Sequence, residues 1–347
     1  MMVNAITLLR ERLNNLKTHL EVSKRIDNIS KHLQTENEDL LYVRSQQTNE
    51  KIFNYRANII SLYGAFEAFI EDIFKEYVNN LHIIIPKYDS LPSNIKDNYF
   101  SNTAKLHSRL NYSKFSHITE KQIAENIEKV IVQNQNNILP ESFLGNGGNY
   151  RHDTIRELFN SIGVKELLGH IILIDPLSSF LFGITSDKEQ QKTMIPLRID
   201  DLVNRRNEIA HGANTDDIID NDSFSEMLNF IQLYAESLNI LLIDELLTHK
   251  WSNSPSDTVS PLKVYPNINV IELMIKNQQL SIGDNLILHR HQHPQFIESN
   301  IIGLQIKDND TGEIIDKENI DVTDDEDHLI SIKVSTEVKD RYKLKFI

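Results

Sequence analysis

The sequence predicts an α+β protein, in which an all-α helical bundle is followed by a small C-terminal β-barrel or β-sandwich. Glycine and proline are scarce up to about Lys250, and apolar residues recur there at every third or fourth position. A Ser/Pro-rich stretch, WSNSPSDTVSPLKVYP, interrupts this pattern, and apolar and polar residues alternate beyond it. We therefore divide the chain into a bundle over 1–250, a linker over 251–266 and a β domain over 267–347.

Broad apolar faces predict five or more helices, because such faces need partner helices to cover them. Leu9, Leu13 and Leu20 lie on one such face near the N-terminus. The main predicted helices cover residues 9–33, 49–85, 120–136, 196–211 and 223–249. The β-like runs NLILHR, IIGLQIKD, EIIDKE, LISIKVS and YKLKFI follow the linker.

One predicted helix carries the stretch RIDDLVNRRNEIAHG. Pro196 is expected to open this helix and Gly212 to end it, since proline suits a first turn and glycine a left-handed end. The buried stripe of the helix is predicted to consist of Ile199, Leu202, Val203, Ile209 and Ala210.

Composition limits the classes of function. A net charge of −14 argues against a protein that binds nucleic acid or anionic membranes non-specifically, so RNA would need a local site. The absence of cysteine excludes disulfides and thiolate chemistry. The N-terminus reads as an amphipathic helix rather than a signal peptide, and no run of eighteen uncharged apolar residues is found. We expect a cytoplasmic protein with no membrane partner.

The stretch NRRNEIAHG concentrates polar residues that suit phosphate chemistry. Asn207 and His211 are four residues apart and share a helix face, while Arg206 lies about 100° around the axis. The helix dipole in the last turn favours a protonated His211, and Arg206 offers a planar five-donor fork for phosphate. A histidine at a helix end can equally cap the last carbonyls, so spacing alone does not decide between the two interpretations.

The surrounding residues resemble the HEPN superfamily. Arg206-Asn207 followed by His211 and a glycine is similar to its signature of arginine, a polar residue and a histidine on a late helix. SLYGAFEAFIEDIF, residues 61–74, and GNYRHDTIRELFNSIGV, residues 148–164, resemble further segments of the RiboL-PSP-HEPN branch. The resemblance covers about residues 40–250 and does not reach the β region.

This resemblance implies a metal-independent endoribonuclease without a cofactor, which works as a homodimer on RNA. Its 2′-hydroxyl chemistry leaves a 2′,3′-cyclic phosphate, with His211 in proton transfer, Arg206 stabilising the phosphorane and Asn207 orienting His211 or the phosphate. Family association adds a role as a toxin or anti-phage effector. The alternative is a catalytically silent adaptor, or a dimerisation module that binds RNA or nucleotide.

Four further residues are accessory candidates. Arg205, Arg151 and Arg156 could grip RNA locally, although Arg151 and Arg156, placed on the helix after the glycine-rich loop, are as well explained by a solvated surface. Glu67 lies in an apolar helix face, where a structural pairing with Arg205 or Arg206 is favoured over a role in the site. We expect His152 to be exposed.

The β domain carries two unusual stretches. His289, His291 and His293 alternate in HRHQHPQF and could bind a metal, but Pro294 favours a polar hairpin end. The acidic segment 308–328 lacks the pattern of an EF-hand loop and reads as a solvated edge. We expect this domain to recognise an antitoxin or a trigger protein.

Overall fold

The structure is a computed structural model that describes residues 2–32, 38–145, 149–212, 217–307, 311–322 and 326–347. A helical unit, Met1–Leu242, precedes a second unit, Ile243–Ile347, which contains an antiparallel sheet. The predicted α+β class is therefore confirmed.

Long helices dominate the first unit. The helices are α1 Asn4–His32, α2 Glu38–Ile84, α3 Ser93–His107, α4 Glu120–Ile131, α5 His152–Asn160, α6 Leu167–Ile171, α7 Leu177–Ile184, α8 Lys188–Ala210 and α9 Asn221–Asn253. The last turns of α9, from Ile243 on, belong to the second unit. Short 3-10 turns, Tyr88–Ser90, Ser113–Phe115 and Pro140–Ser142, connect some of them.

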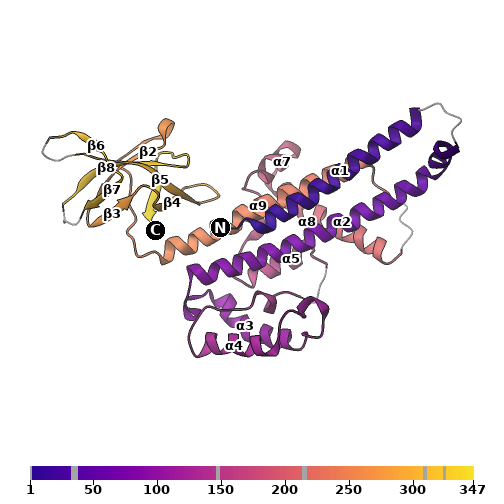
Figure 1. Cartoon of the computed structure of the whole chain (residues 1–347), viewed down its shortest axis with the longest axis horizontal. Helices are drawn as coiled ribbons and strands as arrows, with labels where there is room; N and C mark the ends of the chain where they lie inside the picture. Colours follow the sequence, from indigo (N-terminus) through magenta and orange to yellow (C-terminus); the bar gives the residue numbers. More distant parts are fainter. Residues whose placement is uncertain (1, 33–37, 146–148, 213–216, 308–310, 323–325) are drawn as a thin grey trace. The chain divides into compact units, whose positions relative to one another are not determined.

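The long helix α2 organises the packing of this unit. It lies antiparallel beside α1 and also contacts α8 (Figure 1). Two phenylalanines of α2 pack against other rings. The ring centroid of Phe66 lies 6.1 Å from that of Tyr234 in α9, and the ring centroid of Phe74 lies 5.8 Å from that of Phe159 in α5. Such aromatic pairs add specific geometry to the burial of apolar area. The apolar face predicted for this segment is thus the centre of the core.

Helix α8 differs from the prediction in where it begins and in the burial of its last residue. It begins at Lys188 rather than Pro196, because Asp187 caps it by accepting hydrogen bonds from the backbone N–H groups of Glu189 and Gln190. Pro196 therefore lies inside the helix, where a proline removes one backbone hydrogen bond. Ala210 is exposed, so its predicted place in the buried stripe was wrong.

Two other helices also depart from expectation. Helix α4 ends at Ile131, five residues before the predicted end. Helix α3 was not predicted, since SNIKDNYFSNTAKLH is rich in polar residues and buries only four: Ile95, Tyr99, Thr103 and Leu106.

The second unit contains a half-barrel of antiparallel strands. The strands are β1 Lys263–Tyr265, β2 Val270–Ile275, β3 Gln278–Ser281, β4 Asn285–His289, β5 Phe296–Lys307, β6 Ile314–Asp316, β7 Asn319–Val322, β8 His328–Val334 and β9 Lys343–Phe346. The main sheet has the order β1-β2-β8-β5-β4-β9 with β6 on β5, and β3 pairs with β7. The segment between α9 and β1 is 254–262.

The histidine-rich stretch and the acidic segment both lie in the sheet region of this unit. Residues 290–295 form the turn between β4 and β5, as the hairpin interpretation expected, and the ring of His289 stacks on Phe296 at 4.7 Å. Strands β6 and β7 lie in the acidic segment, where Ile320 and Val322 are buried; residues 308–310 and 323–325 lie outside the described part.

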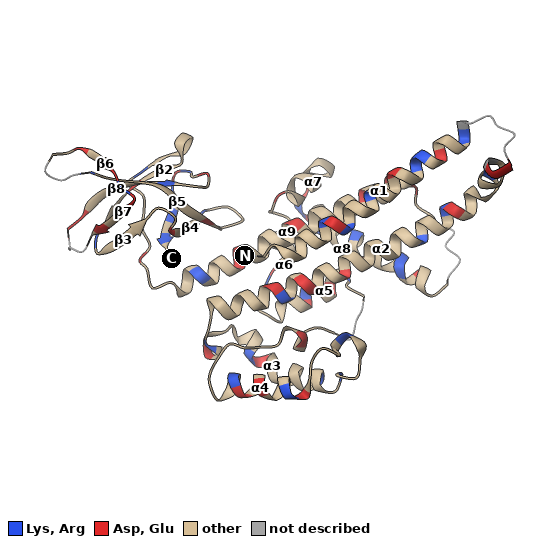
Figure 2. Ribbon diagram, viewed as in Figure 1, with Lys and Arg blue, Asp and Glu red and all other residues tan. Residues whose placement is uncertain are grey.

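Charges of both signs are interspersed along α1, α2 and α9 (Figure 2). Ion pairs between α1 and α9, such as Arg10–Glu236 at 3.0 Å and Lys24–Asp222 at 2.8 Å, use part of this charge. No helix within the described ranges is both long and apolar enough to cross a lipid bilayer.

Asp244 tethers the last turns of α9 to the hairpin of β4 and β5. Its carboxylate is 6 % exposed and accepts hydrogen bonds from the backbone N–H groups of Gln295 and Phe296, at 2.9 and 2.7 Å. Because Asp244→Ala leaves both N–H groups unpaired, we expect it to lower the free energy of unfolding by about 2–4 kcal/mol. Trp251, the single tryptophan, lies 5.4 Å from Phe296 and reports this transition by fluorescence during urea unfolding.

The matched control is Asp257→Ala, at an exposed position in the same unit. Equal unfolding midpoints for the two variants would contradict the tether.

Candidate active site

Helix α8 presents the polar stretch because its other side is anchored. Ile199, Leu202 and Val203 are fully buried, and α8 contacts both α2 and α5. The helix ends at Ala210, so His211 is its C-cap rather than part of the last turn. Gly212 follows with φ +70° and donates its N–H to the carbonyl of Ile209 at 3.1 Å. The predicted glycine stop is confirmed.

Arg206 is held by two contacts. Its Nη1 donates a hydrogen bond to Oδ1 of Asn207 at 3.0 Å, and its guanidinium lies 4.9 Å from the ring centroid of Tyr63. A guanidinium over an aromatic face is attracted by the ring quadrupole, and Arg206 itself is only half-buried. The side chain of Asn207 therefore positions Arg206. The backbone carbonyl of Asn207 accepts the backbone N–H of His211 at 2.9 Å.

The Tyr63 ring is part of a buried polar network under Arg206. Its hydroxyl accepts the backbone N–H of Tyr150 at 3.1 Å, and the Tyr150 hydroxyl donates to Glu71 at 2.8 Å. Glu71 also pairs with Lys114. Burial raises the pKa of Tyr63 and of Tyr150, and the charge of Glu71 raises that of Tyr150 further. Both phenols therefore stay protonated and rigidly placed.

Glu67 belongs to the same neighbourhood. It is half-buried on α2, and its charge raises the pKa of Tyr63 and of Tyr150, while the charge of Arg206 lowers that of Tyr63. The predicted pairing of Glu67 with Arg205 or Arg206 stays a prediction.

Arg205 faces a different set of partners. Its guanidinium donates to the Tyr55 hydroxyl at 3.0 Å, to Asp201 at 3.0 Å, and to both the carbonyl and the carboxylate of Asp217. Its side chain is 13 % exposed. These contacts connect α8 with α2 and with the segment before α9, and they occupy most of the donors of Arg205.

Arg151 and Arg156, predicted to follow the glycine-rich loop, have different surroundings. Residues 146–148 of that loop lie outside the described part. Arg151 is the N-cap of α5, and its Nη2 donates to Oδ1 of Asn204 in α8 at 2.6 Å. Arg156 lies one turn into α5, is 54 % exposed and pairs with Asp153 at 3.1 Å. Arg151 thus borders the polar face of α8, and Arg156 contacts its own helix.

His152 was expected to be exposed, and this was wrong. It is 4 % exposed because it begins the amphipathic helix α5, and its backbone N–H donates to Asp200 of α8 at 3.1 Å. Among the residues that the structure describes, neither ring nitrogen of His152 finds a hydrogen-bond partner. Burial lowers the pKa of His152 below the ordinary 6.5.

The arrangement combines a fixed cation with a free imidazole. His211 is exposed, and its ring makes no hydrogen bond within the described part of the chain. Arg206 offers positive charge to a phosphate, and His211 can exchange a proton with solvent or with a bound group. In the described ranges, no three His, Cys, Asp or Glu side chains are grouped as metal ligands.

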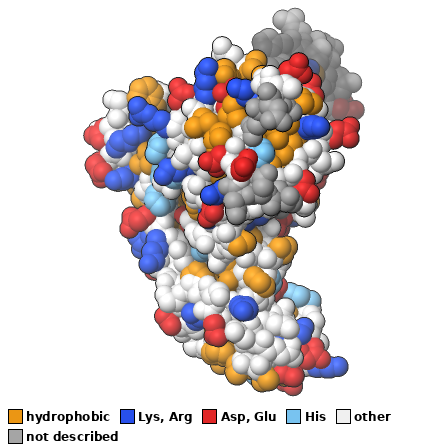
Figure 3. Space-filling view, turned by 90° about the vertical axis from the view of Figure 1, so that its left-hand side faces the viewer, with side chains coloured by type: hydrophobic (Ala, Val, Ile, Leu, Met, Phe, Trp, Pro, Cys, Tyr) orange, Lys and Arg blue, Asp and Glu red, His pale blue; other side chains and the backbone are white. Residues whose placement is uncertain are grey.

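Basic side chains of the described residues form small groups separated by acidic, polar and apolar ones on the face in Figure 3. On this face, the basic side chains drawn in colour therefore do not form one continuous patch.

Sequence reasoning missed Tyr63 and Tyr150 as supports of the site. Both lie in the aromatic-rich segments that carry the family resemblance, one in residues 61–74 and the other in 148–164. Their pairing across 87 residues was not readable from local patterns.

The buried His152 predicts acid sensitivity. Between its folded-state pKa and about 6.5, the unfolded chain binds more protons than the folded one, so stability falls as pH drops through this window. We expect His152→Gln to weaken the dependence of the melting temperature on pH between about 7.5 and 5. His19→Gln, at an exposed site, is the control; parallel curves for His152→Gln and wild type would refute the assignment.

Comparison with known proteins identifies a family. No curated protein matches the sequence. The profile of the RiboL-PSP-HEPN family matches residues 20–244, a range that includes α8 and its polar face as well as Tyr63 and Tyr150. Because this match covers more than half of the chain, the protein belongs to the RiboL-PSP-HEPN family.

Proposed function

We propose that the protein is a metal-independent endoribonuclease of the HEPN type. The proposal is carried by two side chains five residues apart: the Arg206 guanidinium, fixed over Tyr63, and the exposed His211 imidazole, which makes no hydrogen bond in the described part of the chain. Family membership supports an RNA-related or nucleotide-related role. Net negative charge suits an enzyme that grips RNA only at this local site.

The proposed reaction is transesterification by the RNA 2′-hydroxyl. One imidazole takes the proton from the 2′-hydroxyl as its oxygen bonds to phosphorus, and a second donates a proton to the 5′-oxygen as the P–O5′ bond breaks. His211 and the partner subunit's His211 supply these groups in a cleft between two α8 helices. Arg206, oriented by Asn207, stabilises the charge that develops on the phosphorane.

Other residues have proposed supporting roles. Arg151 lies beside Asn204 and adds a positive charge for RNA at the polar face of α8, while Arg205 supports the fold rather than the substrate. We propose a cytoplasmic toxin or anti-phage effector that acts as a homodimer. Its second unit, Ile243–Ile347, binds an antitoxin or a trigger protein.

The central prediction compares His211→Ala and Arg206→Ala with wild type on mixed RNA in EDTA. We expect wild type to leave 2′,3′-cyclic phosphate ends. Losing the proton-transfer group should reduce the rate by about 10²–10⁴, and losing the phosphorane-stabilising cation by about 10²–10³. Cleavage rates and end-group analysis provide the measurement.

His19→Ala and Arg25→Ala are matched controls, because both residues are exposed on α1. Equal cleavage by all variants, or none by any, would count against the enzyme and favour the silent adaptor.

If two subunits share one cleft, an inactive subunit should lower the cleavage activity of the wild-type subunit with which it pairs. Light scattering should give a mass about twice the 40.2 kDa of the chain. In a mixture with tenfold excess of His211→Ala, most wild-type subunits would pair with inactive partners, so activity per wild-type subunit should fall roughly tenfold. Unchanged activity at that ratio would show that one subunit suffices.

A further inference from the structure

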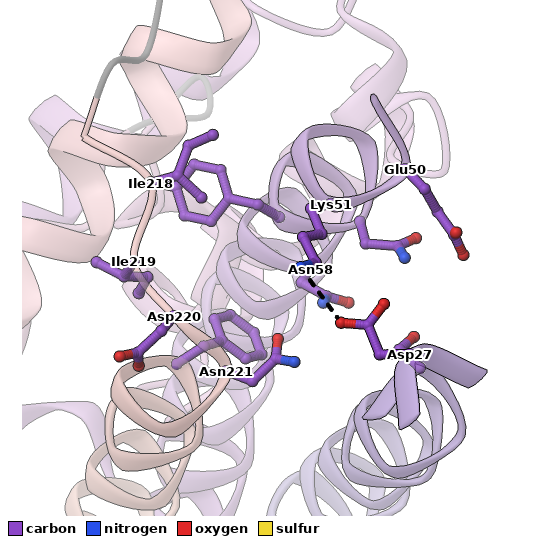
Figure 4. Close-up of a pocket in the computed structure, with 12 residues that line it drawn as sticks. Asp27, Glu50, Lys51, Asn58, Ile218, Ile219, Asp220 and Asn221 are labelled. Carbon is purple, nitrogen blue, oxygen red and sulfur yellow. Dashed lines mark ion pairs between the residues drawn. The ribbon is translucent and has the colours of Figure 1, made fainter. Parts of the chain in front are cut away.

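A pocket of about 250 Å³ lies between α1, α2 and the start of α9. Figure 4 shows its polar residues, which come from three separate segments of the helical unit. One wall is apolar, formed by Ile218, Ile219, Phe224 and the ring of Tyr55, and Tyr55 and Phe224 are both more than nine-tenths buried. Amides and charged groups from the same three segments complete the lining.

Three carboxamides in this pocket lack hydrogen-bond partners for their side chains within the described part of the chain: Asn54, Asn58 and Asn221. Asn58 is 5 % exposed as a residue, and its amide faces the pocket (Figure 4). An amide that faces a pocket without a protein partner keeps its two donors and its acceptor available to a ligand. A ligand that both donates and accepts hydrogen bonds would satisfy it.

The charges of the pocket are largely used by the protein itself. Lys51 pairs with Asp27 across α1 and α2 at 3.5 Å, as the dashed line in Figure 4 shows. Asp220 caps α9 by accepting the N–H of Ser223 at 2.7 Å. Three carboxylates, those of Asp27, Glu50 and Asp220, against one ammonium disfavour a phosphate inside the pocket. The three carboxamides, which the described part of the chain does not pair, therefore favour a neutral ligand.

We propose that this pocket binds a nucleobase of the RNA and gives the enzyme its sequence preference. Planar heterocycles pair with carboxamides through donor and acceptor edges and stack on aromatic rings. Ligand pockets usually measure about 300–1,000 Å³, so this smaller one fits a single base rather than a whole nucleotide. The inference rests on the proposed ribonuclease function.

The pocket is connected to the candidate site by Arg205 and α2. Tyr55 lines the pocket and accepts a hydrogen bond from Arg205, the neighbour of Arg206. Tyr55 and Tyr63 are eight residues apart on α2, which corresponds to about 12 Å along the helix axis. In the proposed complex, a strand with a phosphate at Arg206 would run along α2 and place a nearby base at the pocket.

Two measurements test this proposal with Asn58→Leu. Saturation-transfer NMR with adenosine, guanosine, cytidine and uridine measures base binding without cleavage. At least one nucleoside should bind wild type and His211→Ala equally, and bind Asn58→Leu about tenfold more weakly. Sequencing of cleavage sites on a random RNA pool should show that Asn58→Leu still cuts but with a flattened base preference.

Asn54→Leu provides a second pocket variant if Asn58→Leu does not fold, and Asn14→Leu, exposed on α1, is the control. Cleavage with the wild-type base preference in the pocket variants overturns the inference and leaves the ribonuclease standing. Nucleoside binding that depends on Asn58, without cleavage by wild type, overturns the ribonuclease but supports the base site. If no nucleoside binds wild type, base binding is refuted whatever the cleavage result.

Discussion

Burial of the apolar face of α2 is the constraint on which the rest of the helical unit depends. A 47-residue helix is stable in water only when other elements cover such a face. Helix α1 lies beside it, α8 contacts it, and residues of α5 and α9 bring aromatic rings against it. Two tyrosines of α2, Tyr55 and Tyr63, then receive the two neighbouring arginines of α8.

The turn of an α-helix separates these arginines into different environments. Adjacent residues differ by about 100° around the axis, so Arg205 reaches Tyr55, Asp201 and Asp217 while Arg206 lies over Tyr63. Arg205 stabilises the junction of three segments, and Arg206 keeps part of its surface in water. Arg205 and Arg206 are adjacent and of the same residue type, yet they have different structural roles.

Local patterns predicted the fold class, the long helices and the glycine that ends α8, because these depend on periodicity and on single-residue conformational preference. They failed where capping or distant contacts decide. Capping by Asp187 lets α8 begin at Lys188, eight residues before Pro196. His152 is buried because α5 packs against α8. The candidate residues Arg206, Asn207 and His211 came from a short motif, but their support by Tyr63 and Tyr150 depends on segments far apart in the chain.

The position of His211 at a helix end has a consequence for how the proposed activity depends on protein concentration. Its backbone is fixed by the carbonyl of Asn207, yet its ring has no partner in the described chain that fixes its direction. In the proposed enzyme, a second surface must aim this ring. If the proposed dimer forms, cleavage per chain would rise with protein concentration, because only a paired chain would hold an aimed imidazole.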